Sequence, residues 1–294
     1  MSENNFNGYG TAYMTPKLKK QIEILYNKDD NEIKKSKKWR KIFEEFIQGL
    51  NNGDIRSAEP ENDTWKVNEW VKKGIIIGFR TGELTDMSLK KFPFFDKSTY
   101  PLKKVEKKDN IRIVPGGTSI RQGCYISPGV VMMPPCYVNV GAYVDKATML
   151  DSHSLVGSCA QVGKNCHISA AAQIGGVLEP INARPVIIED NVLIGGNCGI
   201  YEGVLIKKNA ILASGVIITS STPVYDLVKE KIYKTTSSNP LTIPENSVVV
   251  PGSRPASGKF AQKQNINLNT PVIVKYRDAS SNAKTALEEA LRNT

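Results

Sequence analysis

The chain has 294 residues, 40% hydrophobic and 23% charged, so it can bury a core without disulfide or metal support. Lys and Arg outnumber Asp and Glu by 39 to 29, a net charge of +10. The basic excess lies in residues 1–110 and 223–294 as scattered lysines, with no recognisable nucleic-acid-reading module. We therefore expect small anionic ligands and no nucleic acid.

The sequence lacks the usual signals for membranes and export. Its longest charge-free run, residues 122–144, contains Pro128, Pro134 and Pro135 and is too polar for a membrane helix. The N-terminus has no basic stretch followed by an apolar one. Five cysteines without a CxxC pair are typical of reduced thiols, so we expect a cytoplasmic protein with no membrane contact.

Helical spacing dominates residues 15–80. Leu18, Ile22 and Leu25 recur on one helical face, and a second such pattern runs from Trp39 to Leu50 before Asn51, Asn52 and Gly53 end it. A third pattern runs from Val67 to Ile75. We predict an N-terminal helical domain and linker over residues 1–110, with the linker, residues 82–110, marked by prolines and lysines.

A six-residue repeat begins at residue 120. Every sixth residue is aliphatic or Met, and the pattern resumes in a new phase after an interruption of eight extra residues. The sixteen repeat positions are Ile120, Ile126, Met132, Val138, Val144, Leu150, Val156, Val162, Ile168, Ile174, Ile188, Ile194, Ile200, Ile206, Leu212 and Ile218.

Period six fits neither a helix nor an alternating strand, and it is typical of a hexapeptide parallel β-helix, in which three units make one triangular coil. We predict this mainly β domain over residues 111–222, with about five coils spaced by about 4.8 Å. Residues 223–294 are expected to form a short C-terminal segment, with a strand pair from Val224 to Lys234 and a capping helix from Thr285 to Arg292.

Small residues occupy the fourth position after each repeat residue, as a crowded coil interior requires. Four of the five cysteines, Cys124, Cys136, Cys166 and Cys198, fall there, so we interpret them as packing groups and not as nucleophiles. Cys159 lies one residue out of phase. With only two histidines, a three-histidine zinc site is excluded, and we expect no metal.

The interruption, GGVLEPINARP between Ile174 and Ile188, must leave the coil as a loop. Loops inserted into regular scaffolds commonly carry function.

Residues 138–180, VNVGAYVDKATMLDSHSLVGSCAQVGKNCHISAAAQIGGVLEP, resemble the core of the tetrahydrodipicolinate N-succinyltransferases. The likeness extends to Trp65–Arg80, Ile111–Pro115 and Ser247–Gly252. It implies a left-handed β-helix that assembles as a homotrimer, with active sites between neighbouring subunits. It also implies succinyl transfer from succinyl-CoA to the amine of ring-opened tetrahydrodipicolinate in lysine biosynthesis, without a metal.

The resemblance implies roles for three charged residues. Asp151 matches the acidic substrate-binding position and would bind the ammonium group and accept its proton. Arg112 matches the arginine that grips a substrate carboxylate, and Glu179, in the loop, would aid proton transfer or orient the amine. The amides of Gly175 and Gly176 are candidate donors to the oxyanion.

For the thioester, the family lays the pantetheine arm of CoA between coils. The matching positions here are Ala213, Ser214 and Gly215 in a late coil, with Lys259 in a Gly-Lys-aromatic stretch that resembles one the family places near CoA. Succinyl-CoA is then a co-substrate, and no cofactor is permanently bound.

Two departures from the family keep alternatives open. His153 stands where the family usually has Trp, and Gly199 stands where some members carry a glutamate implicated in catalysis. The alternatives are acetyl transfer to the same or a related amino acid, and a β-helix scaffold without catalysis. A sugar-nucleotide acyltransferase or nucleotidyltransferase is disfavoured, because residues 1–110 contain no Gly-rich phosphate loop.

Overall fold

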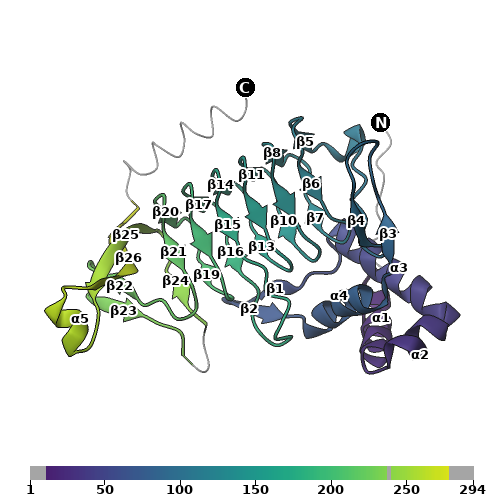
Figure 1. Ribbon diagram of the computed structural model, residues 1–294, viewed down its shortest axis with the longest axis horizontal. Coiled ribbons are helices and arrows are strands. Elements are labelled where there is room, and N and C mark those ends of the chain that lie inside the picture. The colour runs from purple at the N-terminus through teal and green to yellow at the C-terminus, as the bar shows by residue number, and fades with distance from the viewer. Residues whose placement is uncertain (1–10, 237–239, 278–294) are drawn as a thin grey trace.

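The computed structural model describes residues 11–236 and 240–277 and shows a helical segment at one end of a long β-coil (Figure 1). The helices are α1 (Thr11–Tyr26), α2 (Asp30–Lys35), α3 (Lys37–Asn52) and α4 (Glu69–Thr81). Their apolar faces meet in one core that includes Ile22, Phe46 and Ile75, all fully buried or nearly so. The predicted helical segment is confirmed. Within the described residues, no helix combines the length and apolarity needed to cross a bilayer.

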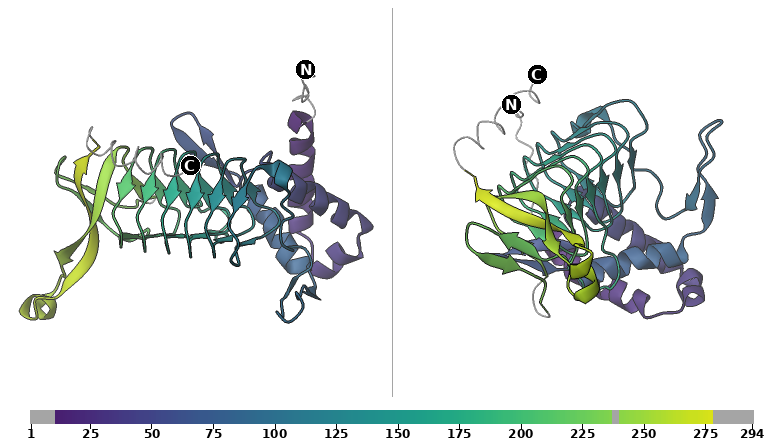
Figure 2. Two further views of the ribbon diagram at one scale, coloured as in Figure 1. Left: turned by 90° about the horizontal axis from the view of Figure 1, so that it is seen from above. Right: turned by 60° about the vertical axis from the view of Figure 1, so that its left-hand side comes forward.

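Two antiparallel hairpins interrupt and follow these helices, and the sequence did not predict them. Strands β1 (Ala58–Glu61) and β2 (Thr64–Val67) lie before α4, while β3 (Leu84–Asp86) and β4 (Phe95–Lys97) lie in the expected linker. The β3–β4 hairpin stands away from the body of the chain (Figure 2). Its base is fixed by an ion pair between Arg121, at the start of the coil, and Asp96.

The coil consists of two-residue strands whose second residue points inward. All sixteen predicted repeat positions are buried, which confirms the six-residue period. The strands are β5 (Arg112–Ile113), β6 (Ser119–Ile120), β7 (Tyr125–Ile126), β8 (Val131–Met132), β9 (Tyr137–Val138), β10 (Tyr143–Val144), β11 (Met149–Leu150), β12 (Leu155–Val156), β13 (Gln161–Val162), β14 (His167–Ile168), β15 (Gln173–Ile174), β16 (Ile187–Ile188), β17 (Leu193–Ile194), β18 (Gly199–Ile200), β19 (Leu205–Ile206), β20 (Ile211–Leu212) and β21 (Ile217–Ile218).

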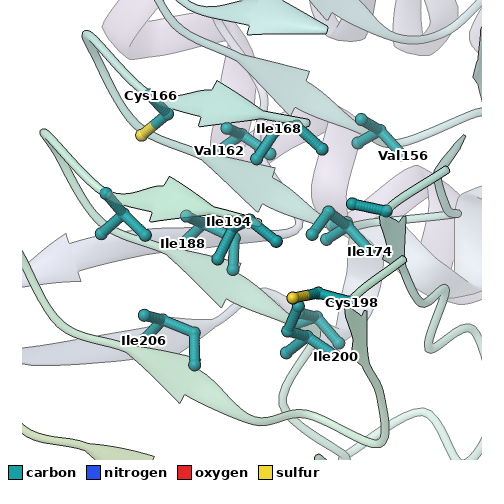
Figure 3. Close-up of a cluster of buried hydrophobic side chains, with 14 of the residues drawn as sticks. Val156, Val162, Cys166, Ile168, Ile174, Ile188, Ile194, Cys198, Ile200 and Ile206 are labelled. Atoms are coloured by element: carbon teal, nitrogen blue, oxygen red, sulfur yellow. The ribbon is translucent and has the colours of Figure 1, made fainter. Parts of the chain in front are cut away.

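These strands form a left-handed β-helix with three parallel sheets. We call the sheets the β11 face (β5, β8, β11, β14, β17, β20), the β12 face (β6, β9, β12, β15, β18, β21) and the β13 face (β7, β10, β13, β16, β19). Paired strands of the regular coils lie 18 residues apart in the chain, as in Met149 beside His167, and 26 apart across the inserted loop, as in Gln161 beside Ile187. Aliphatic side chains with Cys166 and Cys198 fill the interior (Figure 3), so these cysteines are packing groups as predicted.

The third residue after each repeat residue lies at a corner of the coil, and its backbone has positive φ in nearly every unit. Left-handed backbone is tolerated best by Gly and Asn, and both are common here. Cys159 occupies such a position with φ 68°, which accounts for its place one residue out of phase. The residues are Gly123, Gly129, Gly141, Ala147, His153, Cys159, Asn165, Ala171, Asn191, Asn197, Gly203, Asn209 and Gly215.

The N-terminal segment covers the β13 face. The guanidinium of Arg56 lies 3.7 Å from the centre of the Tyr143 ring and donates a hydrogen bond of 3.0 Å to Oε1 of Gln161. Further along the same face, Ala58 and Trp65 pack on Ile187 and Leu205. The β1–β2 hairpin thereby ties the first domain to the coil.

The coil extends beyond residue 222. Strand β24 (Thr242–Ile243) adds to the β13 face, and the first part of β25 (Ser247–Pro255) adds to the β11 face, both in parallel register. The predicted strand pair is confirmed as β22 (Val224–Asp226) and β23 (Lys231–Tyr233). Strand β25 then pairs with β26 (Asn267–Tyr276) around the short helix α5 (Lys259–Lys263). The expected helix at Thr285–Arg292 lies outside the described residues.

Candidate active site

Arg112 and Asp151 belong to the same face of the coil. Arg112 is exposed on β5, in the outward row that continues through Val131, Met149 and His167 on successive strands. Asp151 follows β11 directly, two strand steps from Arg112, which corresponds to about 10 Å along the coil axis. The two predicted substrate-binding residues are therefore brought onto one surface.

The Asp151 carboxylate is turned toward the β11 face. Its Oδ1 accepts a hydrogen bond of 2.7 Å from the Ser152 amide, and its Oδ2 lies 3.8 Å from Nε2 of His167. The backbone amide of Asp151 donates to the carbonyl of Ile168 in the next coil, which fixes the turn. A carboxylate that is held in this way and partly exposed can accept a cationic group from outside the coil.

His167 is a neighbour of Asp151 that the sequence analysis missed. The 18-residue coil period contains the signal, because it places His167 directly beside Met149. His153, in contrast, is exposed at a corner with φ 62°, where its backbone amide donates to Pro135 and its carbonyl accepts from Gln173. Of the two histidines, His167 is the one whose ring faces the Asp151 carboxylate.

Glu179 lies on a different corner of the coil from Asp151. The inserted loop, residues 175–186, leaves after β15 and returns at β16, between the β12 and β13 faces. Asp151 lies between the β11 and β12 faces. Glu179 is exposed on this loop, so the structure does not bring these two predicted catalytic residues together within one chain.

The N-terminal domain holds this loop through Lys72 of α4. The Lys72 side chain is completely buried, and its Nζ donates to the carbonyls of Ala183 at 2.6 Å and Pro180 at 3.5 Å. Burial lowers the pKa of Lys72, while Cys159 and Glu69 oppose that shift. The residue gave no signal in the sequence, because it lies on a helix far from the loop in the chain.

The two glycines that open the loop differ as hydrogen-bond donors. The Gly175 amide donates to the carbonyl of Ile200 at 2.8 Å, so it is engaged between coils and cannot serve an oxyanion. Gly176 is exposed, and its amide makes no backbone hydrogen bond with the described residues. Of the two predicted backbone donors, only Gly176 remains available.

Tyr201 occupies the surface around Gly199. A Cβ atom placed on Gly199 would lie 2.5 Å from Cε2 of Tyr201 and 2.8 Å from its hydroxyl oxygen. A Cβ atom on Gly175 would lie 2.7 Å from Cδ1 of the same ring. The aromatic ring therefore lies directly over both glycines, on the outer side of the β12 face.

The predicted thioester-binding residues Ala213, Ser214 and Gly215 form the corner after β20. This is the same corner of the coil as Asp151, three strand steps away, or about 14 Å. The Ala213 and Gly215 amides donate to the carbonyls of Val249 and Gly196, whereas Ser214 is exposed. Lys259 lies on α5 at the far end of the C-terminal hairpin, apart from this corner (Figure 1).

Two clefts of about 560 and 580 Å³ lie away from these residues. The first is in the N-terminal domain beside Trp39 and Phe43, and the second lies between the β1–β2 hairpin and Glu189. Neither is lined by Arg112, Asp151 or Glu179. Within the described chain, Arg112 and Glu179 are exposed and Asp151 is partly exposed.

All five cysteines are buried, which agrees with the prediction that Cys124, Cys136, Cys166 and Cys198 are packing groups. None of the five forms a disulfide, and burial raises the pKa of Cys124 and Cys159 to about 12 and that of Cys136 to about 11. In the described parts of the chain, no three His, Cys, Asp or Glu side chains gather as metal ligands would.

Two family models match the chain. Residues 17–81 match the N-terminal domain of tetrahydrodipicolinate N-succinyltransferase, and residues 185–220 match the hexapeptide repeat of succinyl-transferase.

Curated relatives match over most of the chain, and each is named 2,3,4,5-tetrahydropyridine-2,6-dicarboxylate N-succinyltransferase. The protein of Acinetobacter baylyi is 40% identical over 86% of this chain and 89% of its own length. That of Polynucleobacter asymbioticus is 42% identical over 86% and 90%. That of Parvibaculum lavamentivorans is 37% identical over 94% and 98%.

Among solved structures, a Campylobacter jejuni protein provisionally assigned as a 2,3,4,5-tetrahydropyridine-2-carboxylate N-succinyltransferase matches with TM-score 0.42 and 17% identity. The match covers 80% of this chain and 62% of that one.

Proposed function

The chain belongs to the tetrahydrodipicolinate N-succinyltransferase family, and from this premise we propose that it transfers succinyl from succinyl-CoA to the amine of ring-opened tetrahydrodipicolinate, a step of lysine and diaminopimelate biosynthesis. The observation that carries the proposal is the placement of Arg112 and Asp151 on one open face. This pairs a carboxylate-binding cation with an ammonium-binding anion, and the substrate presents both groups.

Asp151 binds the substrate ammonium and takes its proton. The free amine nitrogen then bonds to the thioester carbonyl carbon, and the carbon–sulfur bond breaks. Nitrogen loses a second proton, which ends on the CoA sulfur, while Asp151 later releases the first proton to solvent. His167, with Nε2 3.8 Å from Oδ2 of Asp151, lies beside the carboxylate that binds the ammonium group. The chemistry needs no metal.

Arg112 binds a carboxylate of the substrate. Its planar guanidinium can donate two parallel hydrogen bonds to one carboxylate, which a lysine cannot reproduce. The spacing of about 10 Å along the coil suits a seven-carbon dicarboxylate that reaches from Arg112 to Asp151.

A complete site requires a second copy of the chain, and we propose a homotrimer. Arg112 lies on the β11 face and Asp151 at its edge with the β12 face, whereas Gly176 and Glu179 lie at the opposite edge of the β12 face. A neighbouring subunit would bring its Glu179 to the Asp151 of the first, where Glu179 orients the amine or takes part in proton transfer.

Exposed apolar surface supports the assembly. The outward row of the β11 face contains half-buried aliphatic residues and Met149, and large apolar side chains are exposed along the β3–β4 hairpin. Contiguous apolar surface of this kind marks interfaces. The exposed residues of the hairpin are Leu84, Leu89, Phe92, Phe94 and Phe95.

Succinyl-CoA enters as a co-substrate, and its pantetheine arm runs along the corner that carries Ser214. The exposed Ser214 offers donors there, while Ala213 and Gly215 contribute their shape and their fixed backbone. Lys259 binds the phosphates of a CoA that lies against another subunit. Five reduced cysteines favour the cytoplasm as the place of action.

The test is thiol release by the purified protein with 2-aminopimelate, a stable open-chain mimic of the substrate, and either succinyl-CoA or acetyl-CoA. We expect release that depends on both the amine and succinyl-CoA. A preference for acetyl-CoA would replace the succinyl assignment with acetyl transfer. No release with either thioester, from a verified trimer, would favour another amine or the scaffold alternative.

A further inference from the structure

The outer surface of the β12 face is shaped around Tyr201. Its ring lies over Gly199 and Gly175, and any side chain at either position would occupy the space of the ring. The backbone beneath is firmly held, since the Tyr201 amide donates to Ile218 and the Gly175 amide to Ile200. Two adjacent coils therefore have glycine, with no side chain, at the positions that the Tyr201 ring covers.

The hydroxyl group of Tyr201 lies over the outer side of the β12 face. It lies beside Gly199 in the outward row of the β12 face, with Gln173 on the preceding strand and Ile217 on the following one. Within residues 11–236 and 240–277, the hydroxyl has no hydrogen-bond partner, and the side chain is only half-buried. A polar group held by a fixed ring, yet without a partner, is available to a ligand.

We propose that this hydroxyl is a hydrogen-bond donor of the acyl-transfer site between subunits and binds the carbonyl oxygen of a thioester held at the Ser214 corner of the neighbouring chain. The inference rests on the proposed function. The Tyr201 ring touches Gly175, where the loop with Gly176 and Glu179 begins, so donor and loop share one edge of the coil. A phenol donates one hydrogen bond without carrying charge, which suits an oxygen that becomes negative as the amine attacks.

Tyr201→Phe removes the hydroxyl and keeps the ring over both glycines. We expect kcat to fall about a hundredfold, the scale of one lost oxyanion donor, with an unshifted pH profile because no base is removed. The matched control is Tyr125→Phe, since Tyr125 stacks on Tyr143 beneath the N-terminal domain and its ring also remains. The control should retain wild-type kcat.

Gly199→Ala tests the placement of the ring. The added methyl group would displace the Tyr201 ring, so kcat of Gly199→Ala should fall about as far as that of Tyr201→Phe. The double variant should then lose little more kcat than either single variant. If the double variant lost kcat by the full product of the two single effects, the two substitutions would not act through the same hydroxyl group.

A binding measurement separates this inference from the proposed function. In calorimetry, Tyr201→Phe should weaken succinyl-CoA binding about two- to tenfold, the scale of one net hydrogen bond, and leave the affinity for free CoA unchanged. Wild-type kcat together with wild-type succinyl-CoA affinity in Tyr201→Phe would overturn the inference. An inactive wild-type protein would reject the succinyl-transfer proposal, while the binding comparison would still decide the role of Tyr201.

Discussion

Lys72 and Ala183 are joined by a hydrogen bond of 2.6 Å from a fully buried ammonium group to a loop carbonyl. The bond connects helix α4 to the loop that interrupts the coil. Leu178 of the same loop packs against the core of the N-terminal helices. The first domain is thus a structural support for the loop that carries Glu179.

Lys72→Met should release the inserted loop. The substitution keeps the apolar stem but leaves the carbonyls of Ala183 and Pro180 without their donor, at a cost of about 1–3 kcal/mol for a buried unsatisfied group. Limited proteolysis should cut within residues 175–186 faster than in the wild type, and kcat should fall. Lys66→Met, which removes an exposed lysine of β2, is the control. Wild-type protease resistance of the loop in Lys72→Met would contradict this role.

Asp151→Asn should lower turnover at least about a hundredfold, the lower range for a lost general base, and leave the assembly intact. Steady-state thiol release and size-exclusion chromatography measure the two effects. Asp145→Asn is the matched control, because Asp145 is also a turn aspartate that follows a repeat residue, but it lies beside the second cleft.

Arg112→Lys separates binding from chemistry at the same face. It should raise KM for the amine with a smaller change in kcat, since it removes the two-bond grip on a carboxylate and keeps the charge. Full activity of Asp151→Asn would remove Asp151 from the catalytic assignment whatever Arg112→Lys does.

The cysteines should be inert in the folded protein. Burial raises the pKa of Cys124 and Cys159 to about 12 and that of Cys136 to about 11, so almost no thiolate is present at pH 8. Titration with a chromogenic disulfide should detect no fast-reacting thiol in native protein and five after denaturation. A rapid native reaction at any of them would show that its coil opens readily.

Asp226 should contribute an acid-sensitive part of the stability. Burial alone would raise its pKa, but hydrogen bonds from Tyr276 and from the amides of Lys229 and Val228 outweigh burial and lower it. A lowered folded-state pKa means that the unfolded chain binds the proton first. The stabilisation is therefore full above the unfolded pKa of about 3.9 and is lost as the pH falls through the folded value.

Asp226→Asn measures this contribution. At pH 7 it should cost about 1–3 kcal/mol of unfolding free energy, and the difference from wild type should shrink as the pH falls below the unfolded pKa of about 3.9. Denaturant unfolding at equal protein concentration across this pH range gives the comparison. If the difference in unfolding free energy between wild type and Asp226→Asn did not depend on pH, packing and not charge would account for the stabilisation by Asp226.

The coil could be predicted from sequence because its constraint is local and repeated. Each inward position, from Ile120 to Ile218, must be aliphatic to fill the same narrow interior, so the pattern survives without any knowledge of long-range contacts. The β1–β2 hairpin could not be predicted in this way. Its strands are short and largely exposed, and they are stabilised by contacts of Trp65 and Ala58 with the coil.

The site was only partly predictable for a related reason. Arg112 and Asp151 were found by resemblance, and their common face follows from the coil register. Lys72 and Tyr201 were not found. Lys72 contacts the inserted loop only in the folded chain, and the position of the Tyr201 ring depends on the lack of side chains at Gly175 and Gly199. His167 could have been found from the 18-residue period, which places it beside Met149.

The parallel register of the strands also fixes the distance between Asp151 and Ser214. Asp151 and Ser214 lie at the same corner, separated by strand steps of uniform height, so their span of about 14 Å can change only in whole coils of 18 residues. The eight additional residues of the inserted loop leave this span unchanged, because they bulge outward at another corner. Loops on this scaffold can thus diverge while the distance that a long, flexible thioester arm must bridge stays constant.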